Sequence, residues 1–228
     1  MRPLLLALIL LALSLFAAER SRANPQSDPD AANTSPGING RYLLMDTTGH
    51  VVSNEDFSGR LQLITFGYTS CPDVCPTTLA EMVVVLSKLG KDSEHLQALF
   101  ITIDPERDTA ELLRTYVAFF DPRIIALTGS SALVQGAADN FKVRIEKVRE
   151  PGAAVGQYAV DHSAGMYLLG PDGHYIRKFA YAMPPAEIAE WLLAIINSGE
   201  FAAYAKASRR SDARLLPGGV SPSRRYLP

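Results

Sequence analysis

The chain has 228 residues, of which 47% are apolar and 20% are charged, and its formal net charge at pH 7 is -2. This length accommodates one ordinary domain plus terminal extensions, and the apolar fraction excludes a chain that is disordered by composition. A net charge of -2 without a basic block excludes a strong electrostatic case for nucleic-acid binding, so no nucleic-acid partner is expected.

The N-terminus has the features of an export signal. Arg2 precedes an almost unbroken apolar run from Leu4 to Phe16, which has the length of a signal peptide rather than that of a full membrane span. Ser21-Arg22-Ala23 then places small residues at the two positions that a signal peptidase reads. We predict that residues 1–23 form a signal peptide cleaved after Ala23 or, alternatively, an uncleaved membrane anchor. Both alternatives predict export to a bacterial periplasm.

Two polar segments flank the predicted domain. Residues 24–39 are rich in Pro, Ser, Asn and Asp and lack apolar periodicity, which predicts a flexible linker. From Ser198 onward Ser, Arg, Gly and Pro dominate, so we predict a poorly ordered tail over residues 198–228. The folded domain is therefore predicted over residues 40–197.

Residues 40–197 show alternating strand and helix patterns. A hairpin is expected over 42–45 and 51–52 around the turn at residues 46–49, and a second one over 166–169 and 175–179 around Pro171-Asp172-Gly173. Between them we predict strands over 61–66, 99–103, 124–127 and 143–148, and helices from about 76 to Gly90, 108 to 120 and 130 to 140. A last helix begins at Pro184-Pro185. This order predicts an α/β fold whose central mixed sheet has helices on both faces.

The two cysteines, Cys71 and Cys75, are only four positions apart. A disulfide between them would close a very small loop and restrict the unfolded chain little, so a structural staple is a poor explanation. They follow the buried strand over 61–66, and reactive groups gather at such strand ends in open α/β sheets. Pro76 suits the first turn of the next helix, so we expect both sulfurs at or just before a helix N-terminus, where the dipole favours the thiolate.

Two thiolates that turn toward one point are typical of a soft-metal site. Soft thiolates select Cu(I), zinc or an iron–sulfur cluster. A cluster needs four thiolates and structural zinc usually has four protein ligands, whereas copper accepts three donors if a nitrogen is available. His50, His95 and His174 have turn or surface contexts, while His162 leads directly into an apolar strand. From the residues alone, a histidine of this kind is more often a core or surface residue than a ligand.

Several other residues near these candidates could act at the site or have a purely structural role. Asp73 could be a weak oxygen ligand or docking charge, or a loop cap, and Asp161 could orient His162 as a hydrogen-bond acceptor. We predict that Asp108 is the N-cap of the helix that follows it. Tyr68 and Met166 are predicted to pack in the core.

Four separated motifs resemble the Sco/SenC family. In chain order they are Phe66-Gly-Tyr-Thr-Ser-Cys-Pro-Asp-Val-Cys-Pro76, Ile103-Asp-Pro-Glu-Arg-Asp-Thr109, Leu127-Thr-Gly129 and Asp161-His-Ser163. The resemblance extends from about Gly40 to Ile196 with natural spacing. The cysteine pair alone would be a weak signal, but several motifs in register are highly specific.

The resemblance implies a thioredoxin-like fold with a copper ion, Cu(I) or Cu(II), held by Cys71, Cys75 and His162. It further implies a periplasmic or membrane-tethered metallochaperone for assembly of the binuclear copper centre of cytochrome c oxidase. Its partner would then be cytochrome c oxidase subunit II or another copper protein.

Other function classes remain open from the sequence. A thiol–disulfide oxidoreductase that reduces the cysteines of a copper-site partner would use Cys71 and Cys75 as its dithiol, so whether the protein is an enzyme is undecided. Thr69-Ser-Cys71 loosely resembles a peroxiredoxin segment. A peroxidase is disfavoured because the cysteine motif occurs together with the Asp161-His-Ser163 motif. A purely structural exported domain is disfavoured because a Cys71–Cys75 disulfide would close only a very small loop.

Overall fold

The structure, a computed structural model, describes residues 37–149, 151–152, 154, 157–199 and 201–203. The predicted leader over 1–23 and residues 24–36 of the predicted linker lie outside the described residues. None of the helices in the described ranges is both long and apolar enough to cross a membrane.

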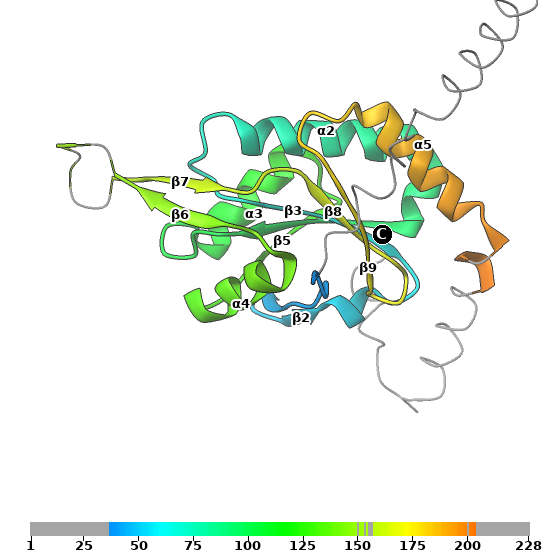
Figure 1. The fold of residues 1–228 in the computed structure, drawn as a ribbon, viewed down its shortest axis with the longest axis horizontal. Coiled ribbons are helices and arrows are strands. Elements are labelled where there is room, and N and C mark those ends of the chain that lie inside the picture. Colours follow the sequence, from blue (N-terminus) through cyan, green and yellow to red (C-terminus); the bar gives the residue numbers. More distant parts are fainter. Residues whose placement is uncertain (1–36, 150, 153, 155–156, 200, 204–228) are drawn as a thin grey trace, which may run out of the picture. The chain divides into compact units, whose positions relative to one another are not determined.

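A seven-stranded mixed sheet forms the centre of the fold (Figure 1), with the strand order β2-β1-β5-β4-β3-β8-β9. The middle strands β3 (Leu61–Gly67), β4 (Leu96–Thr102) and β5 (Ile124–Thr128) are parallel to one another. The outer strands pair antiparallel: β1 (Leu43–Asp46), β2 (Val51–Ser53), β8 (Met166–Leu169) and β9 (Tyr175–Phe179). Every residue of β3 and β4 is buried, as expected for parallel strands covered on both faces.

Helices cover both faces of this sheet, as predicted. Neighbouring residues of β3 point to opposite sides, so Leu63 and Ile64 belong to two separate apolar cores. The first core includes residues of α2 (Val74–Leu89), α3 (Ala110–Phe120) and α5 (Pro185–Ile196). The second includes residues of α4 (Ser131–Phe141) and of the 3-10 helix η2 (Asn54–Phe57), while a second 3-10 helix, η3 (Gly90–His95), follows α2.

A separate two-stranded sheet extends from one end of the domain. It consists of β6 (Ile145–Val148) and β7 (Ala159–His162), paired antiparallel with Ile145 opposite His162. In Figure 1 this β6–β7 hairpin lies beyond the ends of the parallel strands. The sequence pattern predicted β6 with an N-terminal boundary two residues too early and did not predict β7, of which only Val160 is buried.

Other boundaries also differ from the prediction, two of them for identifiable reasons. β4 begins at Leu96 rather than at residue 99, because the polar Gln97 is buried by hydrogen bonds to the carbonyls of Ala98 and Arg123. The N-cap of α3 is Thr109, whose side chain accepts from the Leu112 N–H, and the prediction of Asp108 was wrong.

The tail boundary predicted at Ser198 is also too early. Residues 199 and 201–203 are helical, and Phe201 is only 5% exposed in the first core. Residues 204–228 lie outside the described residues.

Candidate metal centre

Cys71 lies in the loop between β3 and α2, at the carboxyl end of β3, and Cys75 lies in the first turn of α2. The Cys71 N–H donates to the Tyr68 carbonyl at 3.2 Å, and the Cys75 N–H donates to Cys71 Sγ at 3.4 Å. Cys71 is partly exposed, whereas Cys75 is 3% exposed in the first turn of α2. Both cysteines are free thiols that face the same point at the start of the helix.

His162 is the last residue of β7 and reaches the same point from 87 residues further along the chain. Its Nε2 lies 3.6 Å from Cys75 Sγ. The two sulfurs and one imidazole nitrogen all lie within 4.8 Å of one another. Donor atoms bound to one ion at about 2.0–2.3 Å lie about 3.5–4 Å apart, so a small closing movement suffices for all three to bind one metal ion.

The other ring nitrogen of His162 fixes its tautomer. Nδ1 lies 3.1 Å from the Ser163 carbonyl oxygen, and a carbonyl can only accept, so Nδ1 carries the proton. The Nε2 lone pair therefore faces the cysteines. Burial lowers the pKa of His162, which keeps the imidazole neutral and available as a ligand.

Burial has the opposite consequence for the buried cysteine. Desolvation, followed by the hydrogen bond with Cys71, raises the pKa of the Cys75 thiol far above its ordinary value. The expectation that the helix dipole favours both thiolates was therefore wrong for Cys75, because burial outweighs the dipole. A cation at this site would reverse the balance, since metal binding displaces the thiol proton.

Other candidates from the sequence lie outside the donor group. Asp73 occupies the N-cap position of α2, where its exposed side chain makes no capping hydrogen bond. Asp161 forms an exposed ion pair with Arg144 at 2.8 Å, and the Ser163 carbonyl, not Asp161, is the hydrogen-bond partner of His162. Met166 is a core residue, 2% exposed, as predicted.

The three remaining histidines lie apart from the cysteines. His50 and His174 are exposed, and each is paired with an aspartate in its own turn. His95 is partly buried and its ring contacts Phe201. Their interpretation as non-ligand histidines agrees with the donor group found in the described residues.

Three residues support the site in ways that the sequence did not reveal. Gly67, the last residue of β3, has no room for a side chain, because a Cβ there would lie 2.8 Å from Cys75 Sγ. The buried Asp108 accepts hydrogen bonds from the Thr69 N–H and hydroxyl and thereby holds the cysteine loop. The Tyr68 hydroxyl accepts from the Val160 N–H, so this residue bonds to β7 in addition to packing. Each contact spans 39 or more positions or depends on close packing, and none has a local sequence signal.

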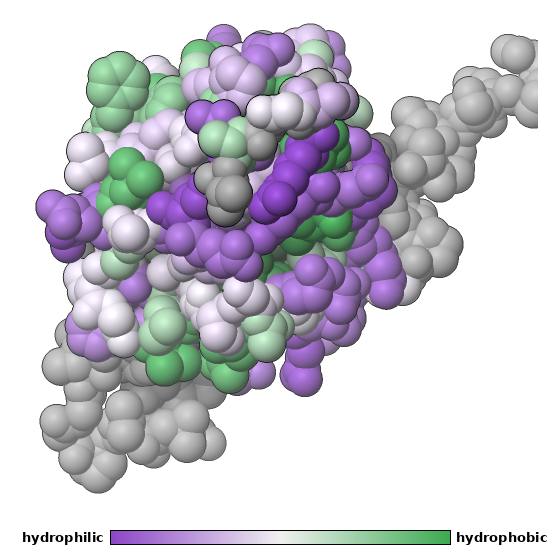
Figure 2. Space-filling model, turned by 90° about the vertical axis from the view of Figure 1, so that its left-hand side faces the viewer, coloured by the Kyte–Doolittle hydropathy of each residue, from purple (hydrophilic) through white to green (hydrophobic). Residues whose placement is uncertain are grey.

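The surface around this end of the domain is mostly hydrophilic. Figure 2 looks onto the end from which β6 and β7 extend, and hydrophilic side chains cross its middle with smaller apolar groups around them. The hairpin's charges are balanced within ion pairs, namely Arg144 with Asp161 and Glu146, and Lys147 with Glu106. The face therefore carries charges of both signs rather than a patch of one sign.

Comparison with known proteins assigns the chain to a family. The model of the SCO1/SenC family matches residues 30–197. The chain belongs to the SCO1/SenC family. A SCO2-like protein of Rickettsia felis is 39% identical over 159 residues, which cover 68% of this chain and 75% of that protein. The mitochondrial SCO1 homologue of Mus musculus is 38% identical over 165 residues, covering 72% of this chain and 57% of that protein.

Solved structures of SCO1/SenC proteins share the fold. Bradyrhizobium japonicum ScoI with copper bound is 38% identical, with a TM-score of 0.63 over 69% of this chain and 98% of that chain. Yeast Sco1 with copper bound is 30% identical, with a TM-score of 0.64 over 77% of this chain and 99% of that chain. These matches confirm the predicted thioredoxin-like α/β fold and the family resemblance.

Proposed function

We propose that this protein binds copper through Cys71, Cys75 and His162 and delivers it during assembly of the binuclear copper centre of cytochrome c oxidase. The observation that carries the proposal is the convergence of two sulfurs and one imidazole nitrogen within 4.8 Å. Family membership and the copper-bound structures of two similar proteins support the choice of metal.

The donor set suits copper as cargo. Two soft sulfurs and one nitrogen favour Cu(I), and three donors leave room for a partner's ligands to displace them one at a time. Each thiol loses its proton when the ion binds and regains one when the ion leaves. Because Cys71 is partly exposed and Cys75 is buried, we expect exchange to begin at Cys71.

The cellular setting is part of the proposal. The apolar segment from Leu4 to Phe16 supports export to the periplasm, with the domain either released or anchored at the inner membrane. Subunit II of the oxidase, or another copper protein exposed to the same compartment, is the proposed partner.

Titration with Cu(I) under reducing conditions tests the site directly. We expect the wild-type protein to bind one equivalent, and His162→Ala to bind far more weakly. His174→Ala is the matched control, because the His174 side chain is 83% exposed and pairs only with its own turn. Equal affinity in the wild-type protein and His162→Ala would contradict the three-ligand site.

A thiol–disulfide reductase is the second candidate, favoured by the partly exposed Cys71 next to the buried Cys75. In this reaction the dithiol gives two electrons and two protons to a partner disulfide and becomes a disulfide itself. Loss of His162 should leave reductase activity largely intact. Oxidase activity in a deletion strain separates the two functions, because rescue by added copper supports delivery, whereas rescue by a thiol reductant supports reduction.

A further inference from the structure

The β6–β7 hairpin that carries His162 is separate from the main sheet. Within the described ranges, β7 pairs only with β6, while the cysteine loop follows β3 of the main sheet. Met166 of β8, four residues after His162, pairs with Thr65 at the end of β3, so the main sheet anchors the chain on the C-terminal side of His162. On the N-terminal side no ladder joins β7 to the main sheet within the described residues, so contacts outside the sheets hold β7 in place.

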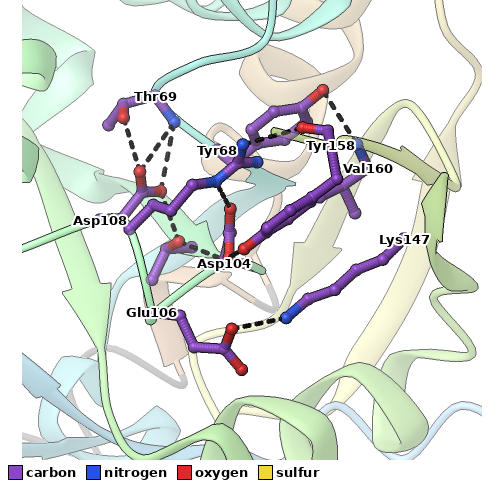
Figure 3. Close-up of polar contacts among 10 residues, drawn as sticks. Tyr68, Thr69, Asp104, Glu106, Asp108, Lys147, Tyr158 and Val160 are labelled. Atoms are coloured by element: carbon purple, nitrogen blue, oxygen red, sulfur yellow. Dashed lines mark hydrogen bonds and ion pairs between the residues drawn. The ribbon is translucent and has the colours of Figure 1, made fainter. Parts of the chain in front are cut away.

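The loop between β4 and α3 holds the base of the hairpin (Figure 3). Arg107 Nη1 donates to the Tyr158 carbonyl at 2.8 Å, and the guanidinium carbon lies 3.7 Å from the centre of the Tyr158 ring. The Tyr158 hydroxyl donates to Asp104 Oδ1 at 2.7 Å, and Arg107 Nε donates to the other carboxylate oxygen of Asp104. Tyr158 directly precedes β7 and is thus fixed through its carbonyl, its ring and its hydroxyl.

Arg107 also contacts the cysteine side of the site through Tyr68. Its guanidinium carbon lies 5.6 Å from the centre of the Tyr68 ring, so the cation lies near two tyrosine rings. The Tyr68 hydroxyl accepts from the Val160 N–H at 3.2 Å (Figure 3). The Tyr68 ring also meets the His162 ring edge-on, with 6.1 Å between the ring centroids.

The same loop holds the cysteines from its other end. Asp108, one residue after Arg107, accepts from the Thr69 N–H and hydroxyl and from the Thr102 hydroxyl. The loop therefore bonds to the hairpin that carries the imidazole and to the loop that carries the sulfurs. Asp104 and Asp108 are both almost fully buried, at 1% and 2% exposure. Water therefore does not compete for their hydrogen bonds, and both carboxylates are held in place by the groups around them.

We propose that Arg107 is a positioning residue of the metal centre, which sets the place of His162 relative to Cys71 and Cys75 by clamping Tyr158. The Asp104 side chain is fully buried and the Arg107 side chain is 26% exposed. An ion pair of this kind contributes little net stability compared with an apolar replacement, and its value here is the fixed geometry that a three-donor site requires. The inference rests on the proposed copper function only for its metal readout. In the metal-free protein it predicts a property of the hairpin itself.

Amide hydrogen exchange of the metal-free protein tests the clamp without copper. Arg107→Lys keeps the charge but loses the fork geometry, and Tyr158→Phe removes only the hydroxyl bond to Asp104. We expect both variants to lose protection at the hairpin amides, Val160 included, while the amides of β3 and β4 stay protected. Unchanged hairpin protection in a folded variant, or equal loss in both sheets, would overturn the proposal.

Glu106→Gln is the matched control. Glu106 joins the same loop to the same hairpin through Lys147, but this ion pair is exposed, with side chains 59% and 44% accessible. Exposed pairs of this kind are weak. We therefore expect wild-type exchange and wild-type copper binding in Glu106→Gln.

A double-mutant cycle separates positioning from general loss of structure. We expect Arg107→Lys to weaken Cu(I) binding by about tenfold to a hundredfold in the wild-type background, the usual effect of removing a residue that orients a ligand. In the His162→Ala background the same substitution should have no further effect. An equal additional loss in both backgrounds would show that Arg107 does not act through His162.

Different results would contradict the proposed copper site and the proposed role of Arg107. If wild-type Cu(I) affinity proves independent of His162, the proposed copper site is wrong, and the exchange measurement still decides whether Arg107 clamps the hairpin. If Arg107→Lys does not fold, Tyr158→Phe carries both measurements, since it retains the ring and the carbonyl that Arg107 contacts.

Discussion

At the scale of single residues, the site combines a neutral imidazole with a thiol that burial keeps protonated. Burial lowers the pKa of His162 and raises the pKa of Cys75, so both groups are uncharged in the metal-free protein at neutral pH. The site therefore contains no buried Cys75 thiolate until a metal cation binds. Proton release is then coupled to metal binding.

This coupling predicts the pH dependence of copper affinity. Below the raised pKa of Cys75, Cu(I) must displace its proton, so affinity should rise about tenfold per pH unit from this thiol alone. Competition with a chromophoric Cu(I) chelator across neutral pH measures the slope. His162→Ala should keep this slope while lowering the affinity, whereas Cys75→Ser should remove the part of the slope that this thiol contributes. A wild-type affinity that is independent of pH would contradict a protonated Cys75.

Gly67 predicts a second effect at this scale. A Cβ at this position would lie 2.8 Å from Cys75 Sγ and 2.9 Å from the Phe100 ring, so Gly67→Ala should displace the sulfur. We expect a loss of about 1–3 kcal/mol in the free energy of unfolding together with weaker Cu(I) binding. Gly136→Ala is the control, since the added Cβ in α4 meets nothing within 4 Å and should stabilise the protein by about 0.5–1 kcal/mol.

At the scale of elements, the loop between β4 and α3 divides two tasks between adjacent residues. Thr109 caps α3, while Asp108 turns inward and holds the cysteine loop and the end of β4. The sequence does not show which of the two residues caps α3. Asp108 and Thr109 both have a side-chain oxygen near the start of the helix, so either could accept the capping hydrogen bond.

The division predicts different results for two neighbouring substitutions. Thr109→Ala removes one capping bond and should cost about 1 kcal/mol of unfolding free energy with unchanged Cu(I) affinity. Asp108→Asn places an amide NH2 among three donors, so it should cost about 1–3 kcal/mol and weaken Cu(I) binding. Urea denaturation and Cu(I) competition on both variants test this. Loss of copper affinity in Thr109→Ala alone would reverse the assignment.

At the scale of the whole molecule, the first core includes a residue that lies beyond the end of α5. Phe201 is 5% exposed, packs among the residues of that core and contacts the His95 ring at 5.4 Å between centroids. The domain therefore extends past Asn197. Composition concealed this, because Phe201 lies within a segment in which Ser, Arg, Gly and Pro dominate.

Phe201 predicts a stability effect far from the metal. Phe201→Ala should lower the unfolding free energy by about 3 kcal/mol through loss of buried area. Phe119→Ala is the matched control, because Phe119 is 85% exposed and its loss should cost under about 0.5 kcal/mol. Thermal or urea unfolding distinguishes the two. Both variants should bind Cu(I) like the wild-type protein, and a changed affinity in Phe201→Ala would show that the core's edge is coupled to the site.

The sequence by itself determined the α/β alternation, the two-faced sheet and the position of the cysteine loop. These features depend on local periodicity, on turn residues and on Pro76 at a helix start, all of which act over a few positions. The family motifs also predicted His162 as the third donor, although the residues near it carried no local sign of a ligand.

Only the tertiary structure decided how His162 reaches the cysteines. β7 is short and half-exposed, so its pattern is weak, and it is fixed by Tyr68 and Arg107 at separations of 92 and 51 positions. The protonation of Cys75 was likewise decided by burial, not by its place at the helix start. The position of His162 and the protonation of Cys75 both depend on the groups that surround them and exclude water. Those groups come from distant parts of the chain and meet only in the folded protein.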